Sequence, residues 1–117
     1  MMRNNRRYRL LLLPVLLAGL FLSGCATMRI AQIKSDPSRY QSKTVRVDGR
    51  VTNSFGVLSS GFYEVEDDTG KIYVISNRGV PSQGSRVTVE GTVFGGATVM
   101  GRAIGVAIRE RNHKVKY

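Results

Sequence analysis

Few side chains in this sequence could carry out catalytic chemistry. An enzyme needs a nucleophile or an acid–base pair held together in a cleft, and the chain has one cysteine, Cys25, and one histidine, His113. Ser59 and Ser60 have no predicted partner base. With a single cysteine, the chain can form neither an internal disulfide nor a zinc site built from thiolates. We therefore expect a non-enzymatic protein that has no catalytic residues and uses no cofactor.

Half of the acidic residues lie in one short stretch, which contains Glu64, Glu66, Asp67 and Asp68. Carboxylate oxygens are the ligands that calcium and magnesium prefer, but this spacing is not that of a calcium-binding loop. We therefore expect no metal site. Acidic side chains on a strand also prevent an exposed sheet edge from pairing with other chains, and this is the role that we predict for them.

Aromatic and basic side chains lie close together in the sequence between residues 50 and 102. A ring beside a cation is the combination that binds single-stranded nucleic acid, where stacking contributes about 1–3 kcal/mol per base. In a small β-barrel, several of the large side chains must also fill the interior. The candidate ligand-binding residues are Arg50, Phe55, Tyr63, Lys71, Tyr73, Phe94 and Arg102, and Phe62 lies beside them in the sequence.

The first 25 residues have the composition of a targeting signal. Four arginines precede an apolar run, residues 10–22, which is shorter than the roughly 20 residues that span a bilayer. Leu22-Ser23-Gly24-Cys25 follows and resembles the lipobox of bacterial lipoproteins. This resemblance implies that the Cys25 thiol receives a diacylglycerol group and that residues 1–24 are removed as a signal peptide. The alternative is an ordinary secretory signal with an incidental cysteine.

The lipobox resemblance also implies a location. In Gram-negative lipoproteins, an aspartate after the acylated cysteine is associated with retention in the inner membrane, and this chain has Ala26 there. We therefore expect a lipid-anchored protein of the outer membrane that faces the periplasm, if the host has an outer membrane. The whole chain has a formal net charge of +10. A positive surface can bind nucleic acid, anionic lipid or acidic glycans, and charge alone does not choose among them.

The chain after residue 24 has the length of one domain, and its pattern is all-β. Val45 to Val51 alternates apolar and polar residues with Gly49 on the apolar face, and Val87 to Val93 repeats the pattern with Gly91. A glycine on the inner face of a strand marks a bulge or a bend. We therefore expect the two segments to be neighbouring strands of similar curvature.

The other expected elements are shorter. Residues 53–60 are predicted to be a loop, and residues 61–76 a hairpin whose turn ends at Gly70, where glycine would supply a positive φ. The last strand is expected at residues 100–111, with Ile104, Val106 and Ile108 inward and a basic tail at residues 112–117. Near the start, the spacing of Ile30 and Ile33 permits a short helical turn, which would plug one end of a barrel together with Tyr40.

Five strands at these spacings, the glycine in the first strand and the copy of that strand in the fourth resemble the OB-fold. Lys43 to Val51, the hairpin turn and Gly84 to Val93 are similar to the nucleic-acid-binding, tRNA-anticodon type of that fold. The resemblance implies a small five-stranded barrel whose second and third strands, with two adjoining loops, present a binding surface. The helix that many OB-folds carry between strands three and four has no room here.

Together these expectations divide the chain into a signal peptide (1–24), a lipidated tether and lead-in (25–40), an OB-like barrel (41–111) and a basic tail (112–117). The expected function is binding of a periplasmic partner or ligand, which could be an envelope protein, a glycan or an anionic polymer. Binding of single-stranded nucleic acid at the cell envelope is the alternative.

Overall fold

A computed structural model of the protein describes residues 26–116. The predictions for the leader and for acylation of Cys25 lie outside the described residues. Within residues 26–116, no helix is both long enough and apolar enough to cross a membrane.

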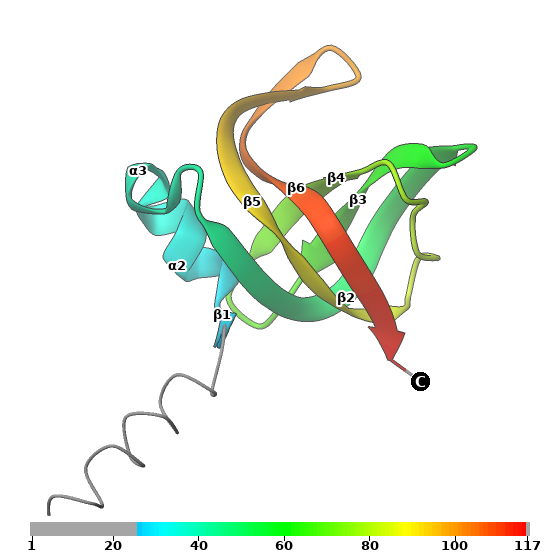
Figure 1. Cartoon of the computed structure of the whole chain (residues 1–117), viewed down its shortest axis with the longest axis horizontal. Coiled ribbons are helices and arrows are strands. Elements are labelled where there is room, and N and C mark those ends of the chain that lie inside the picture. The colour runs from blue at the N-terminus through cyan, green and yellow to red at the C-terminus, as the bar shows by residue number, and fades with distance from the viewer. Residues whose placement is uncertain (1–25, 117) are drawn as a thin grey trace, which may run out of the picture.

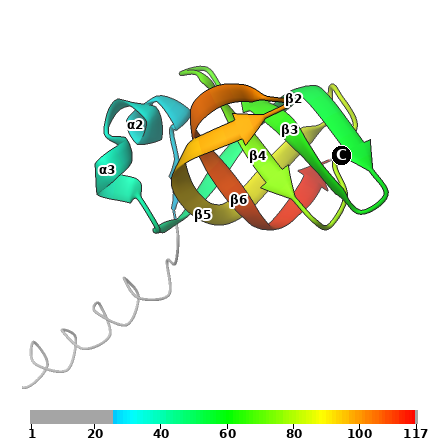
Figure 2. The ribbon, with the colours of Figure 1, turned by 90° about the horizontal axis from the view of Figure 1, so that it is seen from above.

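The strands of the chain close into a barrel (Figures 1 and 2). They are β1 (Thr27–Met28), β2 (Thr44–Val57), β3 (Ser60–Glu66), β4 (Lys71–Ser76), β5 (Arg86–Val99) and β6 (Arg102–Lys116). They are hydrogen-bonded in the order β1-β2-β3-β4-β6-β5, and a further pairing of β2 with β5 completes the ring. The β4–β6 pair is parallel. This is an all-β, OB-like fold, so the five-strand prediction is confirmed, and β1 is a short addition that pairs in parallel with β2.

The two strands with the repeated valine–glycine pattern are neighbours, as predicted. β2 and β5 pair antiparallel, with Val45 opposite Gly91 and Gly49 opposite Val87. A Cβ atom on Gly49 would meet the carbonyl oxygen of Glu66 and would lie 2.7 Å from Cγ1 of Val65. At Gly91 a Cβ would meet the backbone of β6 in the same way. Glycine is needed at both positions because the backbone of a crossing strand occupies the space of a side chain.

Two short helices cover one end of the barrel, at the left of Figure 1: α2 (Ile30–Ser35) and α3 (Pro37–Tyr40). Ile30 and Ile33 are fully buried in the core cluster, and the partly buried Tyr40 packs against it. Full burial of an isoleucine side chain contributes about 1.5–3 kcal/mol relative to exposure. The prediction that these residues plug the barrel is therefore confirmed.

The turn between β3 and β4 is held by a side chain. Gly70 is not among the glycines with positive φ, so that prediction is wrong. Instead, Oδ1 of Asp67 accepts hydrogen bonds from the backbone N–H groups of Thr69 (2.7 Å) and Gly70 (3.0 Å) and from the Thr69 hydroxyl (2.6 Å). Its Oδ2 accepts from the N–H of Ile30 at 3.0 Å, which ties the turn to the first residue of α2.

These hydrogen bonds make the free energy of unfolding depend on pH. Burial acts to raise the pKa of Asp67, but the hydrogen bonds from Thr69, Ile30 and Gly70 outweigh it, so the pKa lies below its usual value. The resulting stability is present above the unfolded-state pKa, about 3.9, and is lost as pH falls through the lower folded pKa. Asp67→Ala should therefore cost about 1 kcal/mol at pH 7, and urea denaturation should show a smaller difference near pH 2. Asp68→Ala, the exposed neighbour, is the control.

One predicted loop and the predicted tail are strands in the structure. β2 continues to Val57 and β3 begins at Ser60, so the loop expected at residues 53–60 is mostly strand, with a tight turn at its tip. β6 continues to Lys116, so residues 112–116 are not a tail, because they pair with β5 from Lys116 opposite Arg86 onward. Irregular register between β5 and β6 breaks the simple alternation. For this reason only Ile108 of the three residues expected inward is fully buried, and Ile104 and Val106 are half-buried.

Candidate ligand-binding groove

Three aromatic rings form a row across the outer face of β2, β3 and β4. Phe55 lies opposite Phe62 in the sheet, and their rings stack with centroids 5.5 Å apart. Tyr73 on β4 meets Phe62 edge to face at 6.0 Å. These geometries are the favourable ones for aromatic pairs, which gain about 0.5–1.5 kcal/mol beyond the area that they bury. The row is therefore a fixed apolar surface made by the sheet itself.

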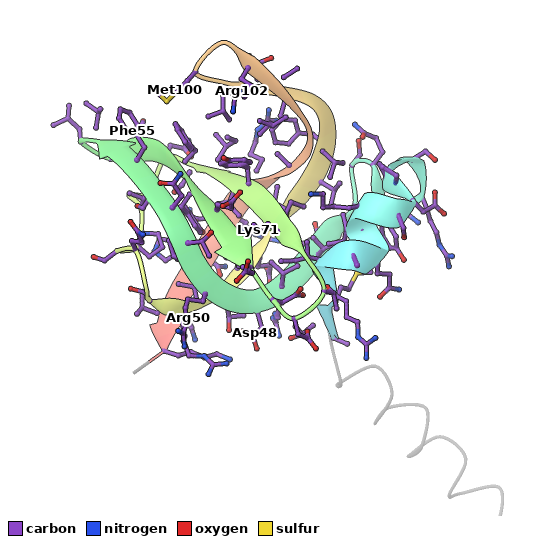
Figure 3. All side chains as sticks on the ribbon, turned by 180° about the vertical axis from the view of Figure 1, so that it is seen from behind. Asp48, Arg50, Phe55, Lys71, Met100 and Arg102 are labelled. Carbon is purple, nitrogen blue, oxygen red and sulfur yellow. The ribbon has the colours of Figure 1, made fainter. Side chains whose placement is uncertain are left out.

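The turn between β5 and β6 lies beside this row and makes a groove (Figure 3). The hollow measures about 390 Å³. We call it the aromatic groove; its lining residues are Asn53, Ser54, Phe55, Phe62, Tyr73, Val99, Met100, Arg102 and Ile104. A second hollow of about 340 Å³ adjoins it, shares Tyr73, Arg102 and Ile104, and adds Lys34 and Lys71. The binding surface is therefore open and elongated.

Apolar side chains project on both sides of the aromatic groove. Phe55 is 48% exposed and Leu58, at the β2–β3 turn, is 98% exposed. On the other side Met100, at the β5–β6 turn, is 79% exposed. Leu58 and Met100 both have positive φ, a backbone conformation that disfavours such side chains. Large apolar residues held in solvent beside a groove are typical of an interaction site.

The charged groups along the groove are mostly basic. Arg102 forms no ion pair with another described residue, whereas Lys71 lies 3.5 Å from a carboxylate oxygen of Glu66. Glu64 lines the adjoining hollow and accepts a hydrogen bond from the hydroxyl of Thr52 at 2.8 Å. Arg102 is therefore the cation available to a ligand in the aromatic groove.

Four of the seven predicted ligand-binding residues meet at this surface. Phe55, Tyr73 and Arg102 line the aromatic groove, and Lys71 lines the adjoining hollow. They come from β2, β4 and β6, so the barrel brings together residues that are far apart in the sequence.

The other three predicted residues lie elsewhere. Tyr63 is fully buried, so its prediction as a ligand contact is wrong, since its ring fills the core. Arg50 lies at the end of the barrel away from Phe55 and Arg102 (Figure 3) and lines a separate hollow with Asp48. Phe94 does not line the aromatic groove, and the guanidinium of Arg109 lies 4.8 Å from its ring centroid.

Sequence reasoning missed the contribution of the β5–β6 turn. Met100 stands in a glycine-rich stretch that was predicted as the start of a strand, and the structure makes it the tip of a hairpin arm. The signal that could have found it is the glycine that follows, since Gly101 has a positive φ typical of a turn. Among residues 26–116, no group of three or more histidine, cysteine, aspartate or glutamate side chains is arranged to hold a metal ion.

Solved structures share this fold. The chain is similar to asparaginyl-tRNA synthetase from Pyrococcus horikoshii, with 23% identity and a TM-score of 0.54 over 66% of this chain and 20% of that one. It is also similar to aspartyl-tRNA synthetase from Entamoeba histolytica, with 17% identity and a TM-score of 0.62 over 82% of this chain and 22% of that one. The likeness is one of fold alone. The chain spans about a fifth of the length of these synthetases.

A third similar structure is OBody AM3L09 bound to hen egg-white lysozyme, with 21% identity and a TM-score of 0.53 over 66% of this chain and 84% of that one. No protein-family model matches the sequence, and no curated protein matches it significantly.

Proposed function

We propose that this protein is a non-enzymatic, lipid-anchored component of the cell envelope, acylated at Cys25, whose aromatic groove binds a segment of a periplasmic partner protein. The observation that carries the proposal is the row of Phe55, Phe62 and Tyr73 in a groove with exposed apolar residues on both sides. In protein interfaces a few aromatic anchors, surrounded by contacts that exclude water, carry most of the binding energy.

Two further features favour a polypeptide over a glycan. Leu58 and Met100 offer apolar contact area beyond the groove, and the hydroxyl groups of a sugar buried against them would lose hydrogen bonds to water without gaining others. In addition, residues 102–106 pair with β5 along one edge, and no other strand among residues 26–116 pairs with them. An extended peptide can add to such an edge through main-chain hydrogen bonds. The similar OBody is bound to a protein, lysozyme.

The position of the groove suits an anchored protein. β1 begins two residues after Cys25 and pairs with β2 at Arg46 and Val47, at the end of the barrel away from Phe55 and Met100 (Figures 1 and 3). A lipid on Cys25 would therefore leave the aromatic groove directed away from the membrane. The groove would be open to partners in the periplasm.

The groove prediction is tested by alanine variants. Tyr73→Ala and Phe55→Ala should each weaken partner binding by about thirtyfold, because truncating a hot-spot aromatic costs about 2 kcal/mol. The partner is first identified by cross-linking in intact cells and mass spectrometry, and its affinity for the purified variants is then measured. Arg78→Ala, an exposed arginine outside the groove, should bind as the wild type does. Unchanged affinity in both aromatic variants would exclude the aromatic groove as the partner-binding site.

Single-stranded nucleic acid is the second candidate ligand. Stacked rings beside Arg102 suit bases and phosphates, and two similar structures are tRNA synthetases. This alternative predicts that an oligonucleotide binds with strong salt dependence and that Arg102→Ala reduces the salt slope. Salt-independent binding, or none, would leave the partner protein as the ligand.

The anchor has its own test. Cys25→Ala should abolish the incorporation of radioactive palmitate and should also prevent cleavage of the signal peptide. The wild-type protein should be labelled and should be recovered with outer membranes. Two chains of lipid hold a protein stably, since each buried methylene contributes about 0.8 kcal/mol. An unlabelled wild-type protein would refute acylation, and recovery chiefly with inner membranes would refute the predicted location.

A further inference from the structure

Three basic residues lie directly opposite one another on three neighbouring strands of the barrel. Arg50 on β2 is paired with Arg86 on β5, and Arg86 is paired with Lys116 on β6. All three are exposed. Like charges opposite each other across strands repel and are destabilising. A row of this kind is relieved when an anion binds to it.

The row is part of a larger positive surface. We call the outer face of β2, β5 and β6 the basic face; it carries the cations Arg46, Arg50, Arg86, Lys114 and Lys116 and the carboxylates Asp48 and Glu90. Arg46 pairs with Glu90 at 3.0 Å and Lys116 with Asp48 at 2.8 Å. Among the described residues, no carboxylate lies within ion-pair distance of Arg50, Arg86 or Lys114, although Glu66 is opposite Arg50 and the charge of Arg86 helps to lower the pKa of Asp48. Cations therefore outnumber carboxylates on this face by five to two.

The basic face has a boundary on one side. Glu66, Asp67 and Asp68 line a hollow with Arg50 and Arg86 at the β3–β4 turn. Asp67 uses its oxygens to accept hydrogen bonds within the turn, and Glu66 lies 3.5 Å from Lys71. The surface available to an anion therefore extends from Arg50 across β5 and β6 rather than toward this turn.

The start of the described chain lies beside the basic face. Thr27 of β1 pairs with Arg46, one of its cations, and Cys25 precedes Thr27 by two residues. Figure 3 shows Arg50 and Asp48 along the same side of the barrel as β1, the lower side in that view, and Phe55, Met100 and Arg102 along the opposite side. A lipid on Cys25 would thus bring the basic face to the membrane surface.

We propose that the basic face docks onto the anionic headgroups of the membrane that holds the Cys25 lipid, with lipid phosphate groups as its ligand. This inference rests on the proposed acylation of Cys25. The short tether keeps the face at high effective concentration near the headgroups, so weak contacts suffice. Each cation near an anionic surface strengthens attachment about fivefold. Docking fixes the orientation of the barrel and holds the aromatic groove away from the bilayer.

The test uses the full chain purified from membranes and reconstituted into vesicles. The vesicles contain phosphatidylcholine alone or phosphatidylcholine mixed with phosphatidylglycerol. Lysine acetylation by a succinimidyl ester is followed by mass spectrometry at Lys114 and, as an internal reference, at the exposed Lys43 before β2. On anionic vesicles Lys114 should react at least fivefold more slowly than on neutral vesicles, and added salt should reverse the protection. Lys43 should react equally on both.

Paired variants identify the surface. Arg50→Ser combined with Arg86→Ser should remove the protection of Lys114, whereas Arg39→Ser combined with Arg78→Ser, which changes the net charge equally, should retain it. Equal reactivity of Lys114 on neutral and anionic vesicles would overturn the proposal. Protection by a single-stranded oligonucleotide but not by anionic vesicles would also overturn it and would assign the face to nucleic acid.

A separate measurement shows whether Cys25 is acylated. The mass of the peptide that begins at Cys25 reports whether diacylglycerol is attached. If it is absent, the acylation proposal fails, and the same labelling is measured on the unacylated chain mixed with each vesicle type. Salt-sensitive protection of Lys114 on anionic vesicles would then still support the basic face as a membrane-binding surface, and no protection would refute it.

Discussion

Gly49→Val is expected to destabilise the barrel by about 3 kcal/mol and to lower its melting temperature by more than about 10 °C. The new Cβ would meet the carbonyl oxygen of Glu66 and lie 2.7 Å from Cγ1 of Val65. The first of these is backbone in a paired strand, so it cannot rotate away as a side chain would. Relief requires β2 and β3 to separate where β2 changes partners, since Arg50 is paired with both Glu66 and Arg86.

Gly95→Val is the matched control, because Gly95 lies on the other patterned strand, β5, and is exposed. A Cβ there would lie 3.4 Å from Oε1 of Gln41, the flexible end of a side chain, and valine favours strands. Thermal unfolding of the two variants should therefore differ widely. Equal melting temperatures would mean that the β2–β3 crossing is looser than the structure has it. Gly91→Val should resemble Gly49→Val, since its Cβ would meet the carbonyl oxygen of Arg109.

Much of the fold follows from local pattern. The alternation of valines with polar residues requires half-buried strands, and the repeated glycine requires close backbone crossings at matching places. Both features depend on residues that are close together in the sequence, so they can be predicted without knowledge of tertiary contacts. The same is true of Ile30 and Ile33, whose spacing places both on one side of a helical turn and which the structure buries completely.

The wrong predictions concern segments whose local sequence is compatible with two different structures. Gly70 could have closed the hairpin turn by its own backbone freedom, but the Asp67 carboxylate satisfies the turn with hydrogen bonds instead. Residues 112–116 are polar or basic apart from Val115, which is typical of a tail. They form a strand because they pair with β5. Pairing between segments that are distant in the sequence cannot be recognised from the sequence of one segment alone.

The candidate site was predicted in part for the same reason. Phe55, Tyr73 and Arg102 were predicted as ligand contacts because they are aromatic or basic, and the barrel places them together. Tyr63 has the same chemistry but faces inward. Its alternation with Glu64 and Val65 contains the signal that was overlooked, since residues two apart on a strand share a face and Val65 is fully buried.

The second large effect is expected at Glu110, whose side chain is completely buried. Its Oε1 accepts a hydrogen bond from the Tyr63 hydroxyl at 2.5 Å and lies 2.6 Å from Nδ1 of His113. Its Oε2 accepts from the Ser76 hydroxyl at 2.8 Å. Burial, the hydrogen bond to Glu110 and the negative charge of Glu110 all raise the pKa of Tyr63, so the hydroxyl keeps its proton and acts as a donor. This explains why a glutamate tolerates the interior of the barrel.

Glu110→Ala should therefore cost about 3–5 kcal/mol in urea denaturation, because it leaves a cavity and deprives the buried Tyr63 hydroxyl of its acceptor. Glu64→Ala, which removes a half-buried carboxylate from the outer face, should cost less than about 1 kcal/mol. If part of the cost at Glu110 comes from the lost hydrogen bond with Tyr63, Glu110→Leu combined with Tyr63→Phe should destabilise by clearly less than the two single changes added together, because the double variant has no hydroxyl at residue 63 left without its acceptor. Additive effects would show that the Glu110 carboxyl group and the Tyr63 hydroxyl do not stabilise each other.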